Sequence, residues 1–348
     1  MLTGQFKLDQ LLKSTSRAFY LSLRILPRQV RKPISLAYLV ARAADTITDT
    51  SNISVEAKIK SLDTLKSALN DDRYDINLPW LYENNTNDNL SELENQLIQA
   101  IPITLSCIQS LHSSDYIQVK KVISTLIEGM EMDLRHFSEA INAHEILSLT
   151  NSDELDLYTY LVAGCVGPFW TQISFANKPN LKKIDMSLLS SLAIDFGKAL
   201  QMTNILRDCP SDIRLGKCYI PSEELNDLHL SPADLLNSNL EKEIRQLLAN
   251  QINKTLDLYK SAEKYVLSIP KNQLRLRLAV LWPLLLGLGT LEALVFNPTW
   301  IQSTSPVKVS RFWVYKMILK SLFVVPSDYL IKFWIKQLRN SINQKLRV

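Results

Sequence analysis

The chain has 348 residues, of which 46% are hydrophobic and 21% are charged, an ordinary globular balance that is long enough for a large core. Only 8 residues are glycine, and this scarcity argues against a fold of many short strands joined by tight turns. The net charge of +4 is uneven: residues 305–348 hold nine Lys or Arg and one acidic residue, a charge of +8, which leaves −4 for residues 1–304.

Apolar residues recur at helical spacing along most of the chain, and nothing alternates with period two for long enough to predict a sheet. We therefore predict one all-α domain over residues 1–304, followed by a basic, aromatic pair of helices over residues 305–348. Loops are predicted over residues 70–89 and 213–221. In chain order, the predicted helices cover residues 34–50 (entered after Pro33), 115–137, 153–175, 189–212 and 240–269.

Residues 278–291 form the most apolar segment, which is too short to span a bilayer and suits a buried core helix. The N-terminal residues lack the apolar stretch of a signal peptide, so a cytoplasmic location is expected. The four cysteines have neither CxxC spacing nor a neighbouring histidine cluster, so we expect reduced thiols and no structural zinc site. They are Cys107, Cys165, Cys209 and Cys218.

The segment ARAADTITDT, residues 41–50, places two aspartates four residues apart in apolar surroundings. Positions four apart lie about 40° apart around a helix, so Asp45 and Asp49 point the same way. Arg42 and Tyr38, three and seven residues before Asp45, share that face. These residues form a first acidic stripe.

A second acidic stripe lies in QMTNILRDCPSDIRLGKCYIP, residues 201–221. Its polar members fall within an arc of about 80° on one helix face, and an arginine, Arg207, lies in the same segment. The polar members are Gln201, Asn204, Asp208 and Asp212.

Each stripe alone could be a solvated helix face, and the arginines could simply pair with the aspartates. The apolar flanks and the recurrence of the pattern favour a functional role. Like charges at this spacing repel, and Mg²⁺, which takes carboxylate oxygens, water and substrate phosphates, would relieve the repulsion. The residues alone thus suggest an all-α, Mg²⁺-dependent enzyme that ionises a prenyl diphosphate in an apolar cavity.

Five ordered motifs, spread over about Ser16 to Leu294, resemble those of the squalene and phytoene synthases, the head-to-head prenyl transferases. The DxxxD spacing, in place of DDxxD, argues against the head-to-tail chain-elongating synthases. The resemblance implies the isoprenoid synthase fold, a single helical domain with a central cavity. The motifs are SRAFYLSLRILP, YLVARAADTITD, EGMEMDL, YTYLVAGCVG and ALQMTNILRDCPSDIRLGKCYIP.

The resemblance also implies how the substrate would be held. The four stripe aspartates (Asp45, Asp49, Asp208 and Asp212) would bind Mg²⁺ and through it two diphosphates, with Gln201 and Asn204 in the same polar wall. Lys217 stands where squalene synthases usually have an arginine, so a point charge replaces a planar fork. Direct contacts to phosphate oxygens would come from Arg17, Arg42, Arg207 and Lys217.

Two tyrosines and two glycines match further positions of the family. Tyr158 would handle a proton or stabilise a cation in the first half-reaction, and Tyr38 would be a second site tyrosine. Gly164 and Gly167 would let the helix backbone break or approach the prenyl chain.

The implied reaction is the condensation of two farnesyl diphosphates through presqualene diphosphate to squalene, as in bacterial squalene synthases, which supply hopanoid or carotenoid precursors. Hydride from NADPH gives squalene, water gives hydroxysqualene, and proton loss gives dehydrosqualene or, from C20 chains, phytoene. Phytoene synthase and dehydrosqualene or hydroxysqualene synthase are therefore the alternatives. Eukaryotic squalene synthases carry two phenylalanines in a late helix, where this chain has Arg277 and Ala279. A non-catalytic assembly factor of the same fold is the alternative of another class, and the presence of all four aspartates disfavours it.

Residues 305–348 interleave Lys and Arg with aromatic residues on both sides of Pro326. Such a segment suits the surface of an anionic membrane. The alternative is a pair of helices packed on the domain with basic outer faces. We expect no nucleic-acid binding, because no recognition motif accompanies the charge.

Overall fold

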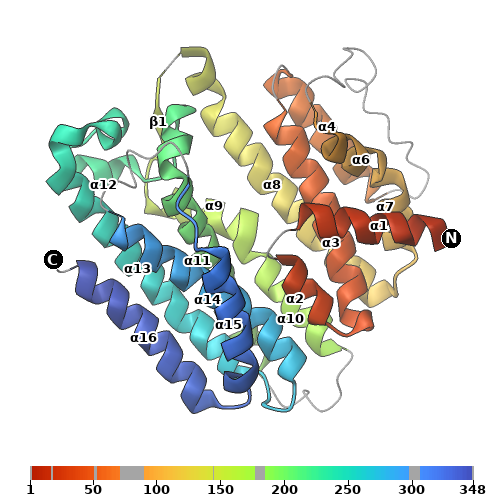
Figure 1. Cartoon of the computed structure of the whole chain (residues 1–348). Helices are drawn as coiled ribbons and strands as arrows, with labels where there is room; N and C mark the ends of the chain where they lie inside the picture. Colours follow the sequence, from red (N-terminus) through yellow and green to blue (C-terminus); the bar gives the residue numbers. More distant parts are fainter. Residues whose placement is uncertain are drawn as a thin grey trace. The chain divides into compact units, whose positions relative to one another are not determined.

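Figure 1 shows the computed structural model, which describes residues 2–16, 19–50, 53–70, 90–143, 145–176, 185–297 and 306–346. Nearly all of these residues are helical, so the predicted all-α class is confirmed. The chain divides into two compact units. The predicted division into residues 1–304 and 305–348 stays a prediction. Unit 1 comprises Met1–Arg135 and Phe169–Ile184, and unit 2 comprises His136–Pro168 and Asp185–Val348.

Unit 1 is built around a long helix, α3 (Arg28–Asp49), which packs against α7, α4 and α6. Its apolar side is buried, with Val40, Ala44 and Ile47 almost inaccessible to solvent. The other helices that lie in this unit are α1 (Leu2–Thr15), α2 (Phe19–Ile25), α4 (Val55–Ala68), α6 (Glu92–Gln99) and α7 (Ile101–Gln109); α8 (Ser113–Ala143) begins in it and α10 (Val166–Ala176) ends in it.

Helix α3 begins at Arg28, five residues before the predicted entry at Pro33. The prediction of a start after Pro33 is therefore wrong. Proline inside a helix removes one backbone hydrogen bond. A side chain nevertheless stabilises the turn between α2 and α3 that precedes Pro33. Arg31 Nη2 donates to the carbonyl oxygens of Arg24 (2.6 Å) and Leu26 (2.8 Å), which holds the junction between α2 and α3.

Unit 2 is organised by α11 (Met186–Arg214), which packs against α13 (Glu241–Ser268) and α14 (Leu274–Phe296). A buried hydrogen bond of 2.9 Å between the hydroxyls of Thr203 and Tyr259 joins α11 to α13. The remaining elements are β1 (Leu147–Ser148), α9 (Ser152–Thr159), the π-helical turn η2 (Tyr160–Gly164), β2 (Lys217–Cys218), α12 (Ser222–Asn226), the 3₁₀ turns η4 (Pro232–Leu236) and η5 (Ser238–Leu240), α15 (Arg311–Val324) and α16 (Asp328–Leu346).

The predicted single helix over residues 153–175 is interrupted by the π-helical turn η2. The Cys165 N–H donates to the Tyr160 carbonyl, five residues back, at 2.8 Å. The segment is fitted closely to α11: a Cβ added to Gly167 would lie 2.2 Å from the carbonyl oxygen of Ala193, and one added to Gly197 would lie 2.4 Å from that of Ala163. Gly167 thus permits contact between two helix backbones. Of the two roles that the resemblance implies for Gly164 and Gly167, a break in the helix is seen at the turn that ends at Gly164, and an approach to the prenyl chain stays a prediction.

Residues 213–221 contain a strand as well as a loop, contrary to the sequence-based prediction. Gly216 takes a positive φ of 83°, which turns the chain after α11. Strand β2 then pairs with β1 in parallel, and Leu147 N–H donates to the Gly216 carbonyl at 3.0 Å. Two-residue pairs of this kind have no periodicity that a sequence could reveal.

Helix α14 is the apolar centre of unit 2 and extends the predicted core segment 278–291 to 23 residues. Within the described residues it is the one helix long and apolar enough to cross a bilayer, but 72% of its most apolar window is buried inside the protein. The expectation that this segment is too short to span a bilayer is therefore wrong for the whole helix, whereas its burial agrees with the expected core helix.

Candidate active site

The first acidic stripe lies near the C-terminal end of α3, in unit 1. Asp45 is partly exposed and Asp49 is exposed, while their neighbours Ala44, Thr46 and Ile47 are buried. Arg42 forms an ion pair with Asp45, three residues on, and their side chains are 35% and 41% exposed. The pairing of an arginine with an aspartate, which the sequence left open as an alternative, is therefore present on α3. At this exposure such a pair contributes at most about 1 kcal/mol, so Arg42 can exchange partners at low cost.

The carboxyl of Asp45 is crowded by protein atoms in spite of its access to solvent. Burial raises the pKa of Asp45, the charge and hydrogen bond of Arg42 lower it, and the nearby Asp133 carboxylate on α8 raises it again, so that the net pKa is raised. Two acidic groups thus share a region in which one arginine does not fully compensate their charge. A hard divalent cation fits this donor set, because Mg²⁺ needs only one or two carboxylates beside substrate phosphates and water.

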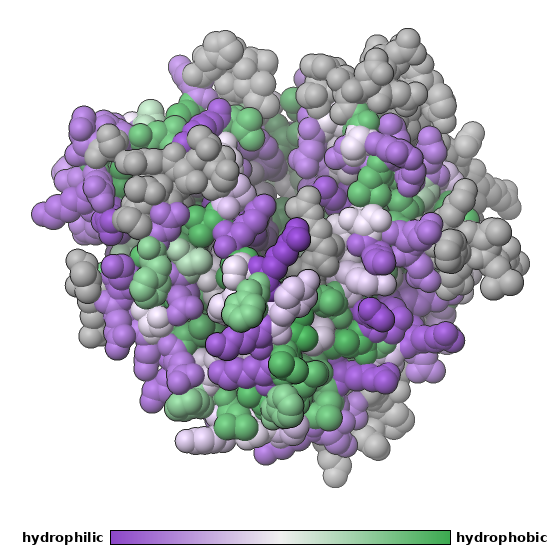
Figure 2. Space-filling model, in the orientation of Figure 1, coloured by the Kyte–Doolittle hydropathy of each residue, from purple (hydrophilic) through white to green (hydrophobic). Residues whose placement is uncertain are grey.

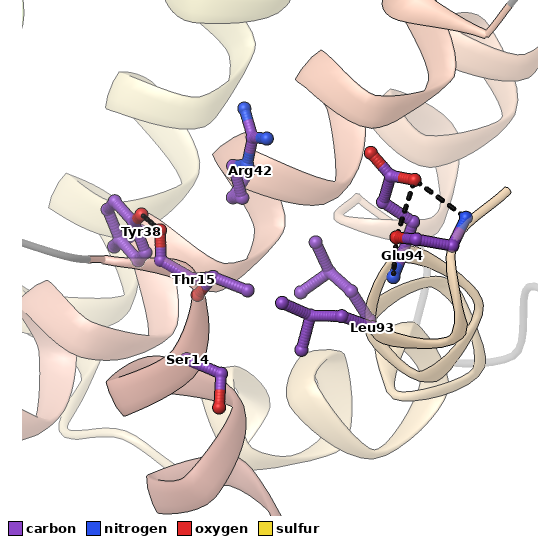
Figure 3. A pocket seen from close by; sticks show the side chains of 8 residues that line it. Ser14, Thr15, Tyr38, Arg42, Leu93 and Glu94 are labelled. Atoms are coloured by element: carbon purple, nitrogen blue, oxygen red, sulfur yellow. Dashed lines mark hydrogen bonds between the residues drawn. The ribbon is translucent and has the colours of Figure 1, made fainter.

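A cavity of about 290 Å³ opens beside Arg42 and Tyr38 in unit 1. Figure 3 shows the Tyr38 hydroxyl turned toward the carbonyl of Thr15, to which it donates at 2.9 Å, and Leu93 projecting into the hollow. The Glu94 carboxylate accepts the Ser91 N–H at 2.9 Å, and hydrogen bonds from the Ser91 hydroxyl and N–H lower the pKa of Glu94. The cavity therefore offers both signs of charge and is no simple anion pocket.

The second acidic stripe runs along α11, in unit 2. Its polar members alternate with buried residues such as Met202, Ile205 and Cys209, so one side of the helix is core and the other is polar. The polar members Gln201, Asn204, Arg207, Asp208 and Asp212 are all partly exposed.

Arg207 forms a two-pronged contact with its neighbour, Nε to Asp208 Oδ1 at 2.9 Å and Nη2 to Asp208 Oδ2 at 2.5 Å. These hydrogen bonds raise the pKa of Arg207 against the opposing effect of burial, and the charges of Asp208 and Asp212 add to the rise. The guanidinium is thus always charged. As on α3, an arginine accompanies a pair of aspartates on one helix face.

Three aromatic rings, two of them stacked, form a cluster beside the second stripe. Tyr158 on α9, 8% exposed, stacks on Tyr219 with centroids 4.9 Å apart and an angle of 18°. Tyr219 meets Phe137 edge-on at 5.2 Å, and Lys217 Nζ lies 5.6 Å from the Phe137 ring centre. Ring faces carry negative charge and attract cations. The stack therefore places a predicted site lysine and a predicted site tyrosine on one aromatic cluster.

Strand β1 is held by a histidine to which the sequence assigned no role. His136 Nε2 lies 2.9 Å from the Ser148 carbonyl oxygen, and Nδ1 lies 3.0 Å from Glu154 Oε1. Because β1 pairs with β2, this contact supports the strand that carries Lys217.

The structure places eleven of the twelve predicted site residues within the two units; Arg17 lies outside the described residues. Tyr38, Arg42, Asp45 and Asp49 share α3, while Gln201, Asn204, Arg207, Asp208 and Asp212 share α11. Tyr158 and Lys217 lie on α9 and β2. Sequence reasoning missed Asp133, Phe137 and Tyr219. Asp133 and Tyr219 stand inside the quoted motifs EGMEMDL and GKCYIP, which could have signalled them.

No cluster of three or more His, Cys, Asp or Glu side chains within the described ranges could enclose a metal ion by itself. The four cysteines lie within the described segments and form no disulfide there, and burial raises the pKa of the Cys209 thiol well above its usual value and that of Cys218 as well. Such thiols are poorly reactive. The functional groups of the candidate site are thus carboxylates, guanidinium groups, an ammonium group and aromatic rings.

A family model described as squalene/phytoene synthase matches residues 12–313 of the chain. The chain belongs to the squalene/phytoene synthase family. Its members transfer prenyl groups, and the all-α isoprenoid synthase fold expected from the motifs is confirmed by solved relatives. TcSQS, solved with the ligand E5700, superimposes with a TM-score of 0.77 at 19% identity, covering 99% of this chain and 98% of that one. The squalene synthase HpnC from Alicyclobacillus acidocaldarius gives a TM-score of 0.59 at 16% identity, covering 86% and 96%.

Curated relatives of the squalene/phytoene synthase family with higher identity are phytoene synthases. The chloroplastic phytoene synthase of an Oncidium hybrid cultivar is 28% identical over 279 residues, which are 80% of this chain and 57% of the relative. The bifunctional lycopene cyclase/phytoene synthase of Podospora anserina is 26% identical over 262 residues, which are 75% of this chain and 42% of the relative. The chain thus spans about half the length of these relatives.

Proposed function

We propose that this member of the family joins two farnesyl diphosphates head to head through presqualene diphosphate to squalene. One observation carries the proposal: both aspartate pairs are present, each on one helix face with an arginine beside it, as Arg42 with Asp45 and Arg207 with Asp208. Family membership supports prenyl transfer. The farnesyl chain length of the substrate is part of this proposal.

The aspartates would hold the metal. Asp45 and Asp49 on α3 and Asp208 and Asp212 on α11 each offer two carboxylates at helical spacing, the donor type that Mg²⁺ prefers. Bound Mg²⁺ would neutralise the diphosphate and improve it as a leaving group.

The cationic side chains would contact the diphosphates directly. Arg42 and Arg207 now pair with aspartates at about one-third exposure, and each can turn to phosphate oxygens when substrate arrives. Lys217 and Arg17 would complete this set, while Gln201 and Asn204 would donate hydrogen bonds from the polar wall. Lys217 brings a point charge with rotatable donors where an arginine would bring a fork.

The aromatic stack would protect the cation left by the departing diphosphate. Tyr158 is buried and its ring lies against Tyr219, so its environment favours stabilisation of a cation and exclusion of water. Tyr38, whose hydroxyl is bonded to Thr15, would shape the site on α3.

The quench of the last cation is the step on which the alternatives differ. Arg277, matched by resemblance to a phenylalanine of eukaryotic squalene synthases, is completely buried and bonded to Asp328. An arginine engaged in this way cannot replace the phenylalanine. This observation, with the phytoene synthase relatives, favours a second candidate that ends by proton loss or water capture: phytoene, dehydrosqualene or hydroxysqualene synthase. NADPH would be needed only for squalene.

We infer a peripheral location at the cytoplasmic face of a membrane. Any of these products except hydroxysqualene is a hydrocarbon without a polar group, so water strongly disfavours its release. An enzyme at a lipid surface would release product into the hydrocarbon phase directly.

Product analysis tests the proposal. Purified protein is incubated with farnesyl diphosphate and Mg²⁺, with and without NADPH, and the extracted lipids are identified by mass. Squalene formed only with NADPH is the expected result. Dehydrosqualene or hydroxysqualene formed regardless of NADPH, or turnover only of the C20 diphosphate, would establish the second candidate. No turnover of either chain would leave the non-catalytic assembly factor.

A further inference from the structure

The C-terminal helices α15 and α16 are firmly seated on the rest of unit 2. Both pack on α14, and α16 also packs on α13. Trp282 Nε1 on α14 donates to the Ser321 hydroxyl at 2.8 Å. The Trp313 ring lies so close to Gly289 that an added Cβ would come within 2.5 Å of it. The orientation of α15 relative to α14 is therefore fixed by specific contacts.

The outer side of this helix pair is unusually apolar. Of the fifteen large hydrophobic side chains exposed among the described residues, eight lie between residues 312 and 333. Phe312 is 77% exposed and Phe323 is 74% exposed. Isolated exposed hydrophobic residues are common, but a cluster marks an interaction surface. We call the following residues the α15–α16 surface: Phe312, Tyr315, Leu319, Leu322, Phe323, Tyr329, Leu330 and Phe333.

The apolar residues of α15 form a strip along its exposed face. With 3.6 residues per turn, Phe312, Leu319 and Phe323 lie within about 40° of one another. Lys316 borders the strip on one side, and Arg311 lies beyond it on the other. Figure 2 shows green hydrophobic groups between purple hydrophilic ones over the ribbon of α15 in Figure 1. An apolar strip between cationic borders is the pattern of a helix that lies in a membrane interface.

The charged side chains of α15 and α16 are basic except for Asp328. Asp328 is the only acidic residue from position 305 onward, and it is engaged by Arg277 at 2.5 Å and Lys271 at 3.2 Å. Lys332 and Lys336 lie exposed on α16 beside the stacked rings of Tyr329 and Phe333. A second copy would bring like charges together, whereas an anionic lipid surface complements them.

We propose that the α15–α16 surface docks on an anionic lipid bilayer, with Phe312, Leu319 and Phe323 among the acyl chains and the basic side chains at the level of the headgroups. The α15–α16 surface would thus make the membrane contact inferred above. Only the reason for docking, the release of an apolar product into lipid, rests on the proposed function. The binding itself needs neither substrate nor metal.

Sedimentation with vesicles tests the proposal. The full chain is mixed with vesicles of phosphatidylcholine alone or of phosphatidylcholine with phosphatidylglycerol, at low and high salt. We expect binding to the anionic vesicles that weakens in salt. The double variant Phe312→Ser/Phe323→Ser should lower the partition coefficient roughly tenfold or more, and Arg311→Glu/Lys316→Glu should abolish the preference for anionic lipid.

Exposed hydrophobic residues elsewhere supply the control. Ile117→Ser/Leu188→Ser removes side chains of 58% and 59% exposure and should bind as the wild type does. Equal thermal unfolding of all variants excludes misfolding, and diphosphate release in detergent should stay unchanged, which separates this proposal from the proposed function. Absence of vesicle binding, or equal binding by Phe312→Ser/Phe323→Ser, would overturn it. So would a loss of self-association in that variant without an effect on vesicles, which would assign the surface to a second copy.

Discussion

Tyr158 stacks on Tyr219 with ring centroids 4.9 Å apart, although the two residues lie in different motifs. Tyr158 belongs to α9, and Tyr219 follows directly after β2. The short pairing of β1 with β2 supports this arrangement, because Leu149, three residues before α9, donates its N–H to the Cys218 carbonyl at 3.1 Å. A two-residue strand pair thus joins an aromatic stack to the predicted phosphate-contacting Lys217.

Removal of the Tyr219 ring should slow the reaction. We expect Tyr219→Leu to lower kcat roughly tenfold, since a ring facing a cation contributes about 1 kcal/mol or more when water is excluded. Tyr219→Phe keeps the ring and should retain most of the activity. Steady-state kinetics with the prenyl diphosphate that the enzyme accepts measure both. Equal losses in the two variants would assign the effect to the hydroxyl instead.

Close packing at Gly167 should make this position intolerant of even one methyl group. The added Cβ would lie 2.2 Å from the Ala193 carbonyl oxygen, so we expect Gly167→Ala to lower the free energy of unfolding by about 1–3 kcal/mol. Gly164→Ala is the matched control, because its Cβ would meet side-chain atoms no closer than 3.3 Å. Urea unfolding compares them. A Gly164→Ala protein that is less stable than Gly167→Ala would contradict the packing account.

The buried Arg277 depends on Asp328. Its Nη2 donates to Asp328 at 2.5 Å, and its Nε and Nη1 have no hydrogen-bond partner in the part of the chain that the structure describes. Asp328→Asn would leave a buried charge without a counter-ion, and we expect a loss of about 3 kcal/mol in the free energy of unfolding. Arg277→Met should cost less, because it removes the charge itself. If Arg277→Met is the more damaging change, the ion-pair account is wrong.

Stability should depend on pH through the same pair. Burial alone would raise the pKa of Asp328, but hydrogen bonds from Arg277 and Lys271 and the charges of both outweigh it, so the folded pKa lies below the usual 3.8. The stabilisation from this carboxylate is therefore full above the unfolded pKa and is lost as pH falls through the folded pKa. The difference in unfolding free energy between wild type and Asp328→Asn should shrink as the solution is acidified below about pH 4. A constant difference down to pH 2 would contradict this assignment.

Periodicity predicts long helices and their faces well in this chain. The predicted segments 115–137, 189–212 and 240–269 fall within or nearly coincide with α8, α11 and α13, because each repeats apolar residues over many turns. The acidic faces of α3 and α11 follow from the same geometry. Contacts between elements leave no such periodic signal.

Three features show what local pattern could not supply. The π-helical turn η2 precedes a point where Gly167 meets the α11 backbone, a contact 26 residues away in sequence. The proximity of Asp133 to Asp45 and of Tyr219 to Tyr158 likewise arises when separate elements pack together. Spacing predicts which side chains share one helix face, but only the packed structure reveals what lies opposite them.

Diphosphate release by aspartate variants tests the central claim most directly, because it reports ionisation whatever the chain length or the final quench. Wild type, Asp45→Asn, Asp208→Asn and the control Asp257→Asn, an exposed position on α13, are assayed with C15 and C20 diphosphates and Mg²⁺. Metal stabilisation of the leaving group is worth several kcal/mol, so each stripe variant should lose roughly 100-fold or more while Asp257→Asn stays like wild type. Release by Asp45→Asn and Asp208→Asn at the wild-type rate would show that the two acidic stripes do not perform the chemistry assigned to them.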